Sequence, residues 1–204
     1  MKNKSTLIIP YNHGMIKYNY SFPALATCVY AHYLAGLIEG DGHIAVHDSN
    51  SKSKKFRAKI IITFNLKDKP LAEKLSAVFK VGKVISRPSA GHVILQILAK
   101  QEVLKIINLI NGYMRTPKIE ALHRAITWIN KNDNTSIPYL GLDLSPIDSN
   151  SWLAGFTDAD GNFSITVYDR KKNGKVFRTS VQTFFSFRSK TELFKRGFWK
   201  SRWY

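Results

Sequence analysis

The sequence contains a single cysteine, Cys28, and few acidic residues. One cysteine excludes an internal disulfide framework and a zinc cluster built on cysteine thiolates. The 14 Asp and Glu residues oppose 31 Lys and Arg residues, so the formal net charge is +17. This excess favours a polyanionic partner, because each cation placed on a phosphate releases a condensed counterion. A ribosomal or a membrane-surface protein would have a similar composition.

Long apolar runs are also absent. No stretch approaches the roughly 18 residues needed to cross a bilayer. The first residues, "MKNKSTLIIPYNHG", lack the apolar core and cleavage site of a secretory signal. We therefore expect a soluble protein with no membrane partner, made inside a cell or an organelle. With 204 residues and 44% hydrophobic content, the chain can bury a core as one large domain or two small ones.

One short pattern occurs twice. Residues 34–42 read "LAGLIEGDG" and residues 153–161 read "LAGFTDADG". The later blocks "FRAKIIITF" and "FRTSVQTFF" also correspond, and two matching blocks in the same order indicate an internal duplication. The expected parts are an N-terminal extension (1–30), a first repeat (31–130), a linker rich in Asn, Asp, Ser and Pro (131–150), the start of a second repeat (151–187) and a tail (188–204).

The first repeat predicts alternating helices and hairpins. Its expected elements are helix 31–40, strands 42–46 and 56–64, a helix from residue 68 that ends before Gly82, two strands around a turn at 88–91, and helices 102–110 and 116–130. The second helix is expected to place four apolar side chains on one face: Leu71, Leu75, Val78 and Phe79. The last helix is expected to start with Thr116 as N-cap and Pro117 in its first turn. We thus predict an α+β fold of tandem pseudo-twofold αββαββα repeats, with the second repeat incomplete.

Small residues recur at helical spacing in both copies of the motif. Gly36 and Gly40 lie four residues apart, as do Gly155 and Ala159, so each pair lies on one helix face. Small residues at this spacing let two helix backbones approach closely. We therefore expect the two motif helices to pack against each other through these four residues.

The helix pair would bring together the aspartates at its ends, Asp41 and Asp160. Two like charges at close range repel unless a cation neutralises them. Hard divalent cations such as Mg²⁺ prefer carboxylate and carbonyl oxygens, and two-metal sites suit phosphodiester hydrolysis. Alternatively, the aspartates only end their helices ahead of turns at Gly42 and Gly161. A matched pair in so basic a protein favours the cation site.

These residues carry a family resemblance. Both nine-residue motifs resemble those of the LAGLIDADG homing endonucleases, in the single-chain form common in organelle introns. The stretch "NLINGYMRTPKIEALHRAITWIN" resembles the end of the first repeat in fungal mitochondrial members. The resemblance covers roughly residues 31–187. It implies a monomeric mitochondrial enzyme that cuts a specific double-stranded DNA site by metal-dependent phosphodiester hydrolysis and so promotes intron mobility.

The resemblance also implies roles for individual positions. In the family, the eighth position of each motif is the catalytic, metal-binding acid, and the residue before it offers the metal a backbone carbonyl. Here these positions are Asp41 and Asp160 for the acids and Gly40 and Ala159 for the carbonyls. Position six, Glu39 and Asp158, is usually not catalytic, and we interpret both residues as structural.

The strands that follow each motif alternate apolar and polar residues, so one set should face a core and the other water or bases. A polar and basic strand face can lie in the major groove and offer donors to base edges, while lysines of the hairpin loops contact phosphates. An ordinary solvated strand face shows the same alternation. The residues expected to contact DNA are His47, Lys52, Lys54, Lys55, Arg57, Lys59, Lys83, Arg87, Ser164, Thr166, Tyr168, Arg170, Lys171, Lys172, Lys175 and Arg178.

The tail, 188–204, does not resemble the family. When residues 189–204 are back-translated and read one nucleotide earlier, a continuation emerges that does resemble it. We therefore expect a frameshifted or truncated second repeat of two strands with no helix to cover them, which is unstable and leaves weak or no cleavage activity. The apolar residues expected to lose their cover are Phe163, Ile165, Val167, Phe177 and Val181.

Two alternatives to an active endonuclease stay open. Some relatives are maturases that bind their own intron RNA, which needs the basic surface without the acids. The other alternative is an inactive remnant of the endonuclease.

Overall fold

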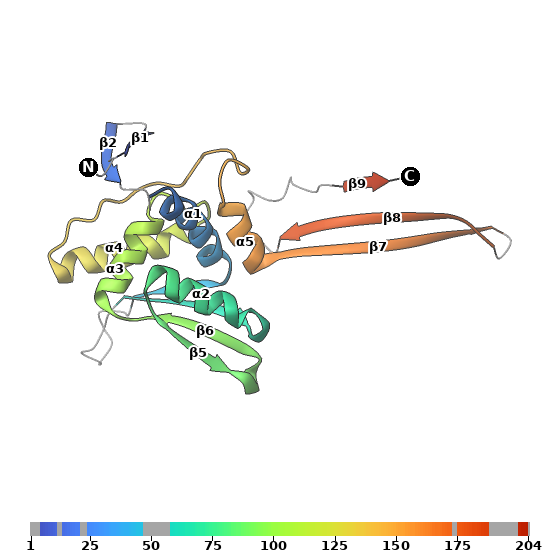
Figure 1. Ribbon diagram of the computed structural model, residues 1–204, viewed down its shortest axis with the longest axis horizontal. Helices are drawn as coiled ribbons and strands as arrows, with labels where there is room; N and C mark the ends of the chain where they lie inside the picture. The colour runs from blue at the N-terminus through green and yellow to red at the C-terminus, as the bar shows by residue number, and fades with distance from the viewer. Residues whose placement is uncertain are drawn as a thin grey trace.

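The computed structural model describes residues 5–11, 14–20, 24–46, 58–172, 175–187 and 200–203. Side chains are described for residues 29–46, 58–169 and 179–186. The chain mixes helices with antiparallel sheets, which confirms the α+β prediction (Figure 1). Within these residues, every helix is too short or too polar to cross a membrane.

The first repeat is built on a four-stranded antiparallel sheet of order β3-β4-β6-β5. Its strands are β3 (Gly42–Ala45), β4 (Lys59–Asn65), β5 (Lys83–Arg87) and β6 (His92–Ile97). Burial follows the expected alternation, because Ile60, Ile62 and Leu95 are buried while Lys59, Thr63 and Gln96 on the other face are not. The buried face packs against the helices and forms the core of the protein.

Helix α2 (Lys69–Phe79) shows how the sequence pattern determines packing in this repeat. Pro70 lies in its first turn, and Lys80 ends it in the left-handed conformation at φ 50°. Leu75 and Phe79 are buried, as expected. The prediction for Val78 was wrong, since this side chain is 45% exposed and Ala72 is buried instead. The apolar face of the helix is therefore narrower than its sequence indicates.

The boundaries of several helices differ from the predictions. Helix α1 (Ala24–Asp41) begins seven residues before the expected residue 31. The segment "ALATCVY" contains no helix breaker, so the helix can extend through it. The segment also lacks the regular polar positions from which an amphipathic helix is predicted. Helix α3 (Lys100–Ile110) ends where expected. Helix α4 (Ile119–Asp133) begins after Thr116, whose Oγ1 still accepts the Lys118 N–H at 3.3 Å.

The N-terminal extension contains a hairpin of its own. Strands β1 (Ser5–Tyr11) and β2 (Gly14–Tyr20) form a separate two-stranded antiparallel sheet.

At the other end of the first repeat, residues 135–150 form no helix or strand and lead from α4 to α5 (Trp152–Asp160). Helix α5 lies beside α1 (Figure 1).

The second repeat continues with a long hairpin that projects away from the helices (Figure 1). Strands β7 (Gly161–Lys172) and β8 (Lys175–Phe187) pair antiparallel along their length. The prediction of two strands was wrong by one, because β9 (Lys200–Trp203) pairs antiparallel with β8. The register pairs Phe184 with Lys200 and Val181 with Trp203, so the third strand runs from near the end of β8 back to its middle.

The apolar face of this hairpin is uncovered, as expected. Phe163, Ile165, Val167 and Val181 are 70%, 71%, 59% and 39% exposed, whereas Ile44 of the matching first-repeat strand is 5% exposed. The side chain of Phe177 lies outside the described residues. Full burial of such a side chain is worth roughly 1.5–3 kcal/mol, so this hairpin lacks a stabilisation that the first repeat has.

Candidate active site between the motif helices

The two motif helices touch backbone to backbone. A methyl group built on Gly36 would overlap the carbonyl oxygen of Trp152, and one built on Gly155 would overlap the carbonyl oxygen of Tyr33. One turn further along, a methyl group on Gly40 would overlap the Cβ of Ala159. Backbone atoms inside a helix cannot move aside locally, so only glycine at the two carbonyl contacts permits this separation between α1 and α5.

This contact brings the two motif aspartates close together. Asp41 is the last residue of α1 and Asp160 the last residue of α5. The pKa of Asp41 is raised, first because its carboxylate loses hydration between its neighbours and then because the negative charge of Asp160 lies nearby. Lys118 opposes both effects. The two carboxylates therefore form an anionic centre at the ends of the paired helices.

A cleft of about 330 Å³ opens beside this centre. Its polar lining comes from Asp41, Asn65, Asp68 and Asp158, and its apolar lining from Phe64, Leu71 and Ala159. The cleft therefore extends from the end of α1 along α5 to the first turn of α2.

Lys118 supplies a positive charge next to the aspartates. Its Nζ donates to the carbonyl oxygens of Ile38, Gly40 and Gly42, at 3.0 Å each. Carbonyls at a helix C-terminus carry partial negative charge, so an ammonium group stabilises the end of α1. Burial lowers the pKa of Lys118, and the carboxylates of Glu39, Asp160 and Asp41 oppose this shift.

Lys118 was absent from the predicted site residues. It lies between Pro117 and the start of α4, and it is not part of a run or a periodic arrangement of charged residues that would single it out. Its position beside the aspartates comes from hydrogen bonds to residues 76 to 80 positions earlier in the chain. The nearest sequence signal is the match of residues 108–130 to the end of a repeat, which places this lysine at the start of a helix that returns to the motif.

The oxygen atoms at this centre fit a hard divalent cation. Asp41 and Asp160 offer carboxylates, and the Gly40 carbonyl that accepts from Lys118 keeps a second lone pair. Among the described residues, no three His, Cys, Asp or Glu side chains gather in a cluster that could hold a metal ion. A cation here would therefore need further oxygens from water or from a bound phosphate.

The acid at position six of the first motif is buried in the protein. The carboxylate of Glu39, 5% exposed, accepts hydrogen bonds from the backbone N–H groups of Arg115 and Thr116 and from the indole N–H of Trp152. Burial raises the pKa of Glu39 although these donors oppose it. The Glu39 carboxylate is therefore used in hydrogen bonds inside the protein, which agrees with the structural role expected for it.

Position six of the second motif makes a corresponding bond. Asp158 accepts a hydrogen bond from the hydroxyl of Tyr33 at 2.8 Å. Burial, and then this bond, raise the pKa of Tyr33, so the phenol keeps its proton and acts as the donor. Both position-six acids therefore bind a side chain from the other motif helix.

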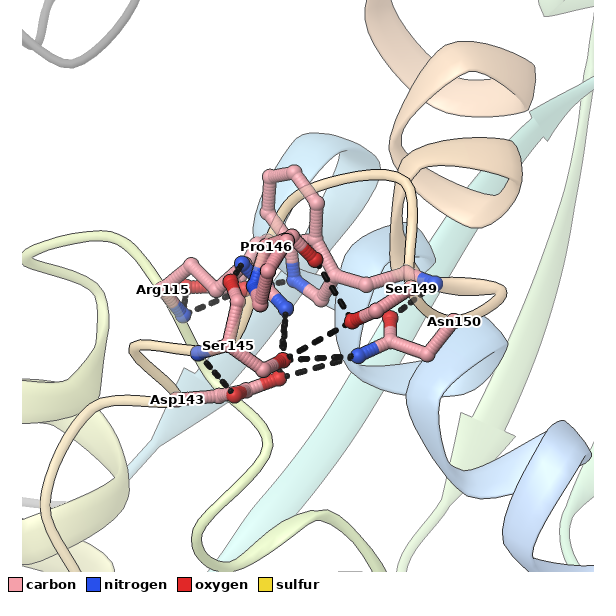
Figure 2. A network of polar contacts seen from close by, with 8 residues as sticks. Arg115, Asp143, Ser145, Pro146, Ser149 and Asn150 are labelled. Carbon is pink, nitrogen blue, oxygen red and sulfur yellow. Dashed lines mark hydrogen bonds and ion pairs between the residues drawn. The ribbon is translucent and has the colours of Figure 1, made fainter.

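The linker is fastened to the first repeat beside Trp152. Arg115 donates to the carbonyl oxygen of Ser145 at 2.6 Å and pairs with Asp143 at 2.7 Å (Figure 2). Asn150 donates to Asp143, and its Oδ1 accepts the backbone N–H of Trp152 at 2.9 Å. The guanidinium of Arg115 also lies 5.6 Å from the Trp152 ring centroid. The start of α5 is thus held by the segment that precedes it.

The outer face of the first sheet carries part of the expected DNA-binding set. Lys59, Lys83 and Arg87 lie on this face, opposite the core. The face is not entirely polar, because the half-buried side chains of Ile85 and Ile94 pair across it. Five members of the set lie outside the described residues: His47, Lys52, Lys54, Lys55 and Arg57.

The other members lie on the long hairpin. Ser164 and Tyr168 are exposed and Thr166 is half-buried, on the face opposite Phe163 and Ile165. Five basic residues have a described backbone but no described side chain: Arg170, Lys171, Lys172, Lys175 and Arg178. Register pairs Lys172 with Lys175 at the end of the hairpin, so this basic group gathers where β7 turns into β8.

We expect Asp41 to make stability depend on pH. Because its folded pKa is raised, its contribution to the free energy of unfolding is fully present below the unfolded pKa and is lost as the pH rises through the folded value. Urea denaturation in metal-free buffer at stepped pH should show this fall in the wild type and a shallower one in Asp41→Asn. Asp148→Asn, in the linker, is the matched control. Parallel pH profiles for wild type and Asp41→Asn would contradict the inferred repulsion.

The chain is similar to known proteins in sequence and in fold. Residues 34–129 and 153–196 match the family model described as LAGLIDADG endonuclease. The second matched segment extends past residue 187, where the expected resemblance ends. The solved structure of the LAGLIDADG meganuclease I-CpaMI bound to uncleaved DNA is 18% identical with a TM-score of 0.53, covering 76% of this chain and 68% of that one. This likeness shows the fold.

Two curated relatives carry functional names. The intron-encoded DNA endonuclease aI3 of Saccharomyces cerevisiae is 44% identical over 152 residues, covering 68% of this chain and 37% of that protein. The intron-encoded RNA maturase bI4 of the same organism is 29% identical over 157 residues, covering 75% of this chain and 22% of that protein. The chain thus spans less than half the length of either relative.

Proposed function

Because this chain belongs to the LAGLIDADG endonuclease family, we propose that it is a site-specific endonuclease for double-stranded DNA, encoded in a mitochondrial intron. The observation that carries the proposal is the anionic centre formed by Asp41 and Asp160 where α1 and α5 end. The name of the yeast DNA endonuclease and the DNA-bound state of the solved relative support it. We further propose that the enzyme acts as a monomer, since one chain supplies both motifs.

The residues that would hold a divalent cation such as Mg²⁺ are Asp41 and Asp160, with the carbonyl groups of Gly40 and Ala159. A cation bound there would neutralise charge on the phosphodiester and lower the pKa of a bound water. The chain itself positions the two carboxylates. The glycine contacts hold the ends of α1 and α5 next to each other, and Lys118 binds carbonyl groups at the end of α1. The strand faces then supply the contacts to DNA.

Cleavage of a library of intron-less DNA sites tests the proposal. We expect double-strand cuts at one site with Mg²⁺ and none with a chelator. Turnover should be weak because the apolar face of β7 and β8 is uncovered, so the assay uses protein in excess over DNA. The comparison is the same protein with Asp160→Asn. Cleavage that persists in the chelator, or equal cleavage by both proteins, would contradict the proposal.

Binding to DNA should depend steeply on salt. For duplex DNA, log K is expected to fall by roughly 0.9 per phosphate contact for each unit of log salt concentration. Lys83→Ala should reduce this slope by about one contact, because Lys83 is exposed on the outer sheet face. Lys100→Ala is the control. Lys100 lies at the start of α3, and its ammonium group pairs with the Asp133 carboxylate of α4 at 2.6 Å, so it belongs to no expected DNA contact. Affinity that is independent of salt would contradict binding through the groove face.

A maturase is the second candidate, favoured by the similarity to the yeast RNA maturase and by the net charge of +17. Such a role needs the basic surface but not the motif aspartates. Competition between labelled target duplex and structured intron RNA distinguishes the two. Preferential binding of RNA that is unaffected by Asp41→Asn, without DNA cleavage, would support the maturase.

A further inference from the structure

The residue directly before each motif is an aromatic one with a single polar hydrogen: Tyr33 before the first and Trp152 before the second. Each donates this hydrogen to the position-six acid of the other motif. The Tyr33 hydroxyl donates to Asp158 at 2.8 Å, and the Trp152 indole N–H donates to Glu39. The two bonds therefore cross the helix interface in opposite directions and are related by the internal repeat.

The same two aromatic residues also take part in the backbone contact. The carbonyl oxygen of Trp152 faces Gly36, and that of Tyr33 faces Gly155. Each aromatic residue is thus held at its carbonyl by a glycine and at its side chain by an acid, both on the opposite helix. Sliding one helix along the other by a single residue, about 1.5 Å, would disturb both side-chain bonds and both glycine contacts.

We propose that Tyr33 and Trp152 are positioning residues, which fix the axial register of α1 against α5 and so the placement of Asp41 opposite Asp160. The inference rests on the proposed function, because the register matters for cleavage only if the two aspartates act together. This role requires no contact of either aromatic residue with Asp41, with Asp160 or with DNA.

The two bonds differ in surroundings. Trp152 is fully buried, stacks on Phe156 with ring centroids 4.9 Å apart, and bonds to the buried Glu39. The bond between Tyr33 and Asp158 is exposed to solvent. A hydrogen bond to a buried acceptor contributes more than an exposed one, because water cannot replace the lost donor. Trp152 should therefore have the larger effect on register.

Conservative substitutions test the positioning role. Trp152→Phe removes the indole N–H and keeps an aromatic ring against Phe156; Tyr33→Phe removes only the hydroxyl. We expect about a tenfold lower single-turnover cleavage rate for Trp152→Phe and about threefold for Tyr33→Phe, with DNA dissociation constants within about twofold of wild type. Trp128→Phe, the same change on α4, is the matched control. Equal losses in Trp128→Phe and Trp152→Phe would overturn the proposal.

Rescue by a conservative variant separates register from general stability. Asp158→Asn keeps an oxygen that accepts from Tyr33, so it should cleave near the wild-type rate, whereas Asp158→Ala should match Tyr33→Phe. Adding Tyr33→Phe to Asp158→Ala should cause no further loss, because one bond is removed by either change. Additive losses, or equal rates for Asp158→Asn and Asp158→Ala, would contradict the inferred bond.

Hydrogen exchange distinguishes failure of this inference from failure of the proposed function. We expect faster amide exchange across α5 in Trp152→Phe than in wild type or Trp128→Phe. If the wild type cleaves no duplex but this difference is present, the proposed function fails and the register role stands. If the wild type cleaves DNA and exchange in α5 is the same in all three proteins, the register role fails and the proposed function stands.

Discussion

Asp41→Asn should abolish cleavage, a loss of at least about a hundredfold, while leaving the dissociation constant for duplex DNA unchanged. The amide keeps the shape of the side chain and loses the charge that would hold a cation. Because the pKa of Asp41 is raised by burial and by Asp160, the neutral amide also relieves a repulsion in metal-free protein. We therefore expect lost activity together with equal or greater stability near neutral pH.

Single-turnover cleavage, DNA binding and urea denaturation on one preparation measure these three quantities. Asp148→Asn is the control, because Asp148 is an exposed acid of the linker. Cleavage by Asp41→Asn at the wild-type rate would remove Asp41 from the catalytic centre. Loss of DNA binding in parallel with cleavage would show that the substitution disturbs the protein more widely.

Gly155→Ala should have the second largest effect. The added methyl group would overlap the Tyr33 carbonyl oxygen inside α1, which cannot move without separating the helices. Overpacking of this kind costs typically about 1–3 kcal/mol, and in a chain of this size each kcal/mol lowers the melting temperature by about 2–4 °C. Cleavage should fall with it, because the separation also moves Asp160 away from Asp41.

The matched control is Gly141→Ala, since a methyl group there would meet no atom within 4 Å. Thermal unfolding and cleavage of both variants give the comparison. A melting temperature for Gly155→Ala equal to that of Gly141→Ala would show that α1 and α5 do not pack as described.

The helix pair could be predicted because its information is local and repeated. Gly36 and Gly155 recur at one position of a duplicated motif, and the motif ends at an aspartate in both copies. Small residues at helical spacing have few uses other than close approach, so duplication and spacing together identify the contact. The burial of Ile60 and Ile62 could also be predicted from the alternation of apolar and polar residues, because only one face of this sheet is covered.

Other parts of the site depend on residues far apart in the chain. Tyr33 and Asp158 are separated by 125 positions, and Glu39 and Trp152 by 113. No local pattern predicts which aromatic side chain meets which acid, and Lys118 was missed for the same reason. The early start of α1 and the exposure of Val78 were also not predicted. The number of apolar residues in a segment does not determine which side of a helix other elements will cover.

We expect Asp41 and Asp160 to act together on one divalent cation centre when DNA is bound. The most direct measurement is anomalous scattering from Mn²⁺ in crystals of the chain with its selected target duplex. The expected result is Mn²⁺ bound to the carboxylates of both Asp41 and Asp160 in the wild type and lost from that position in Asp41→Asn. Bound duplex with no Mn²⁺ at these carboxylates, or with Mn²⁺ that Asp41→Asn leaves in place, would contradict it.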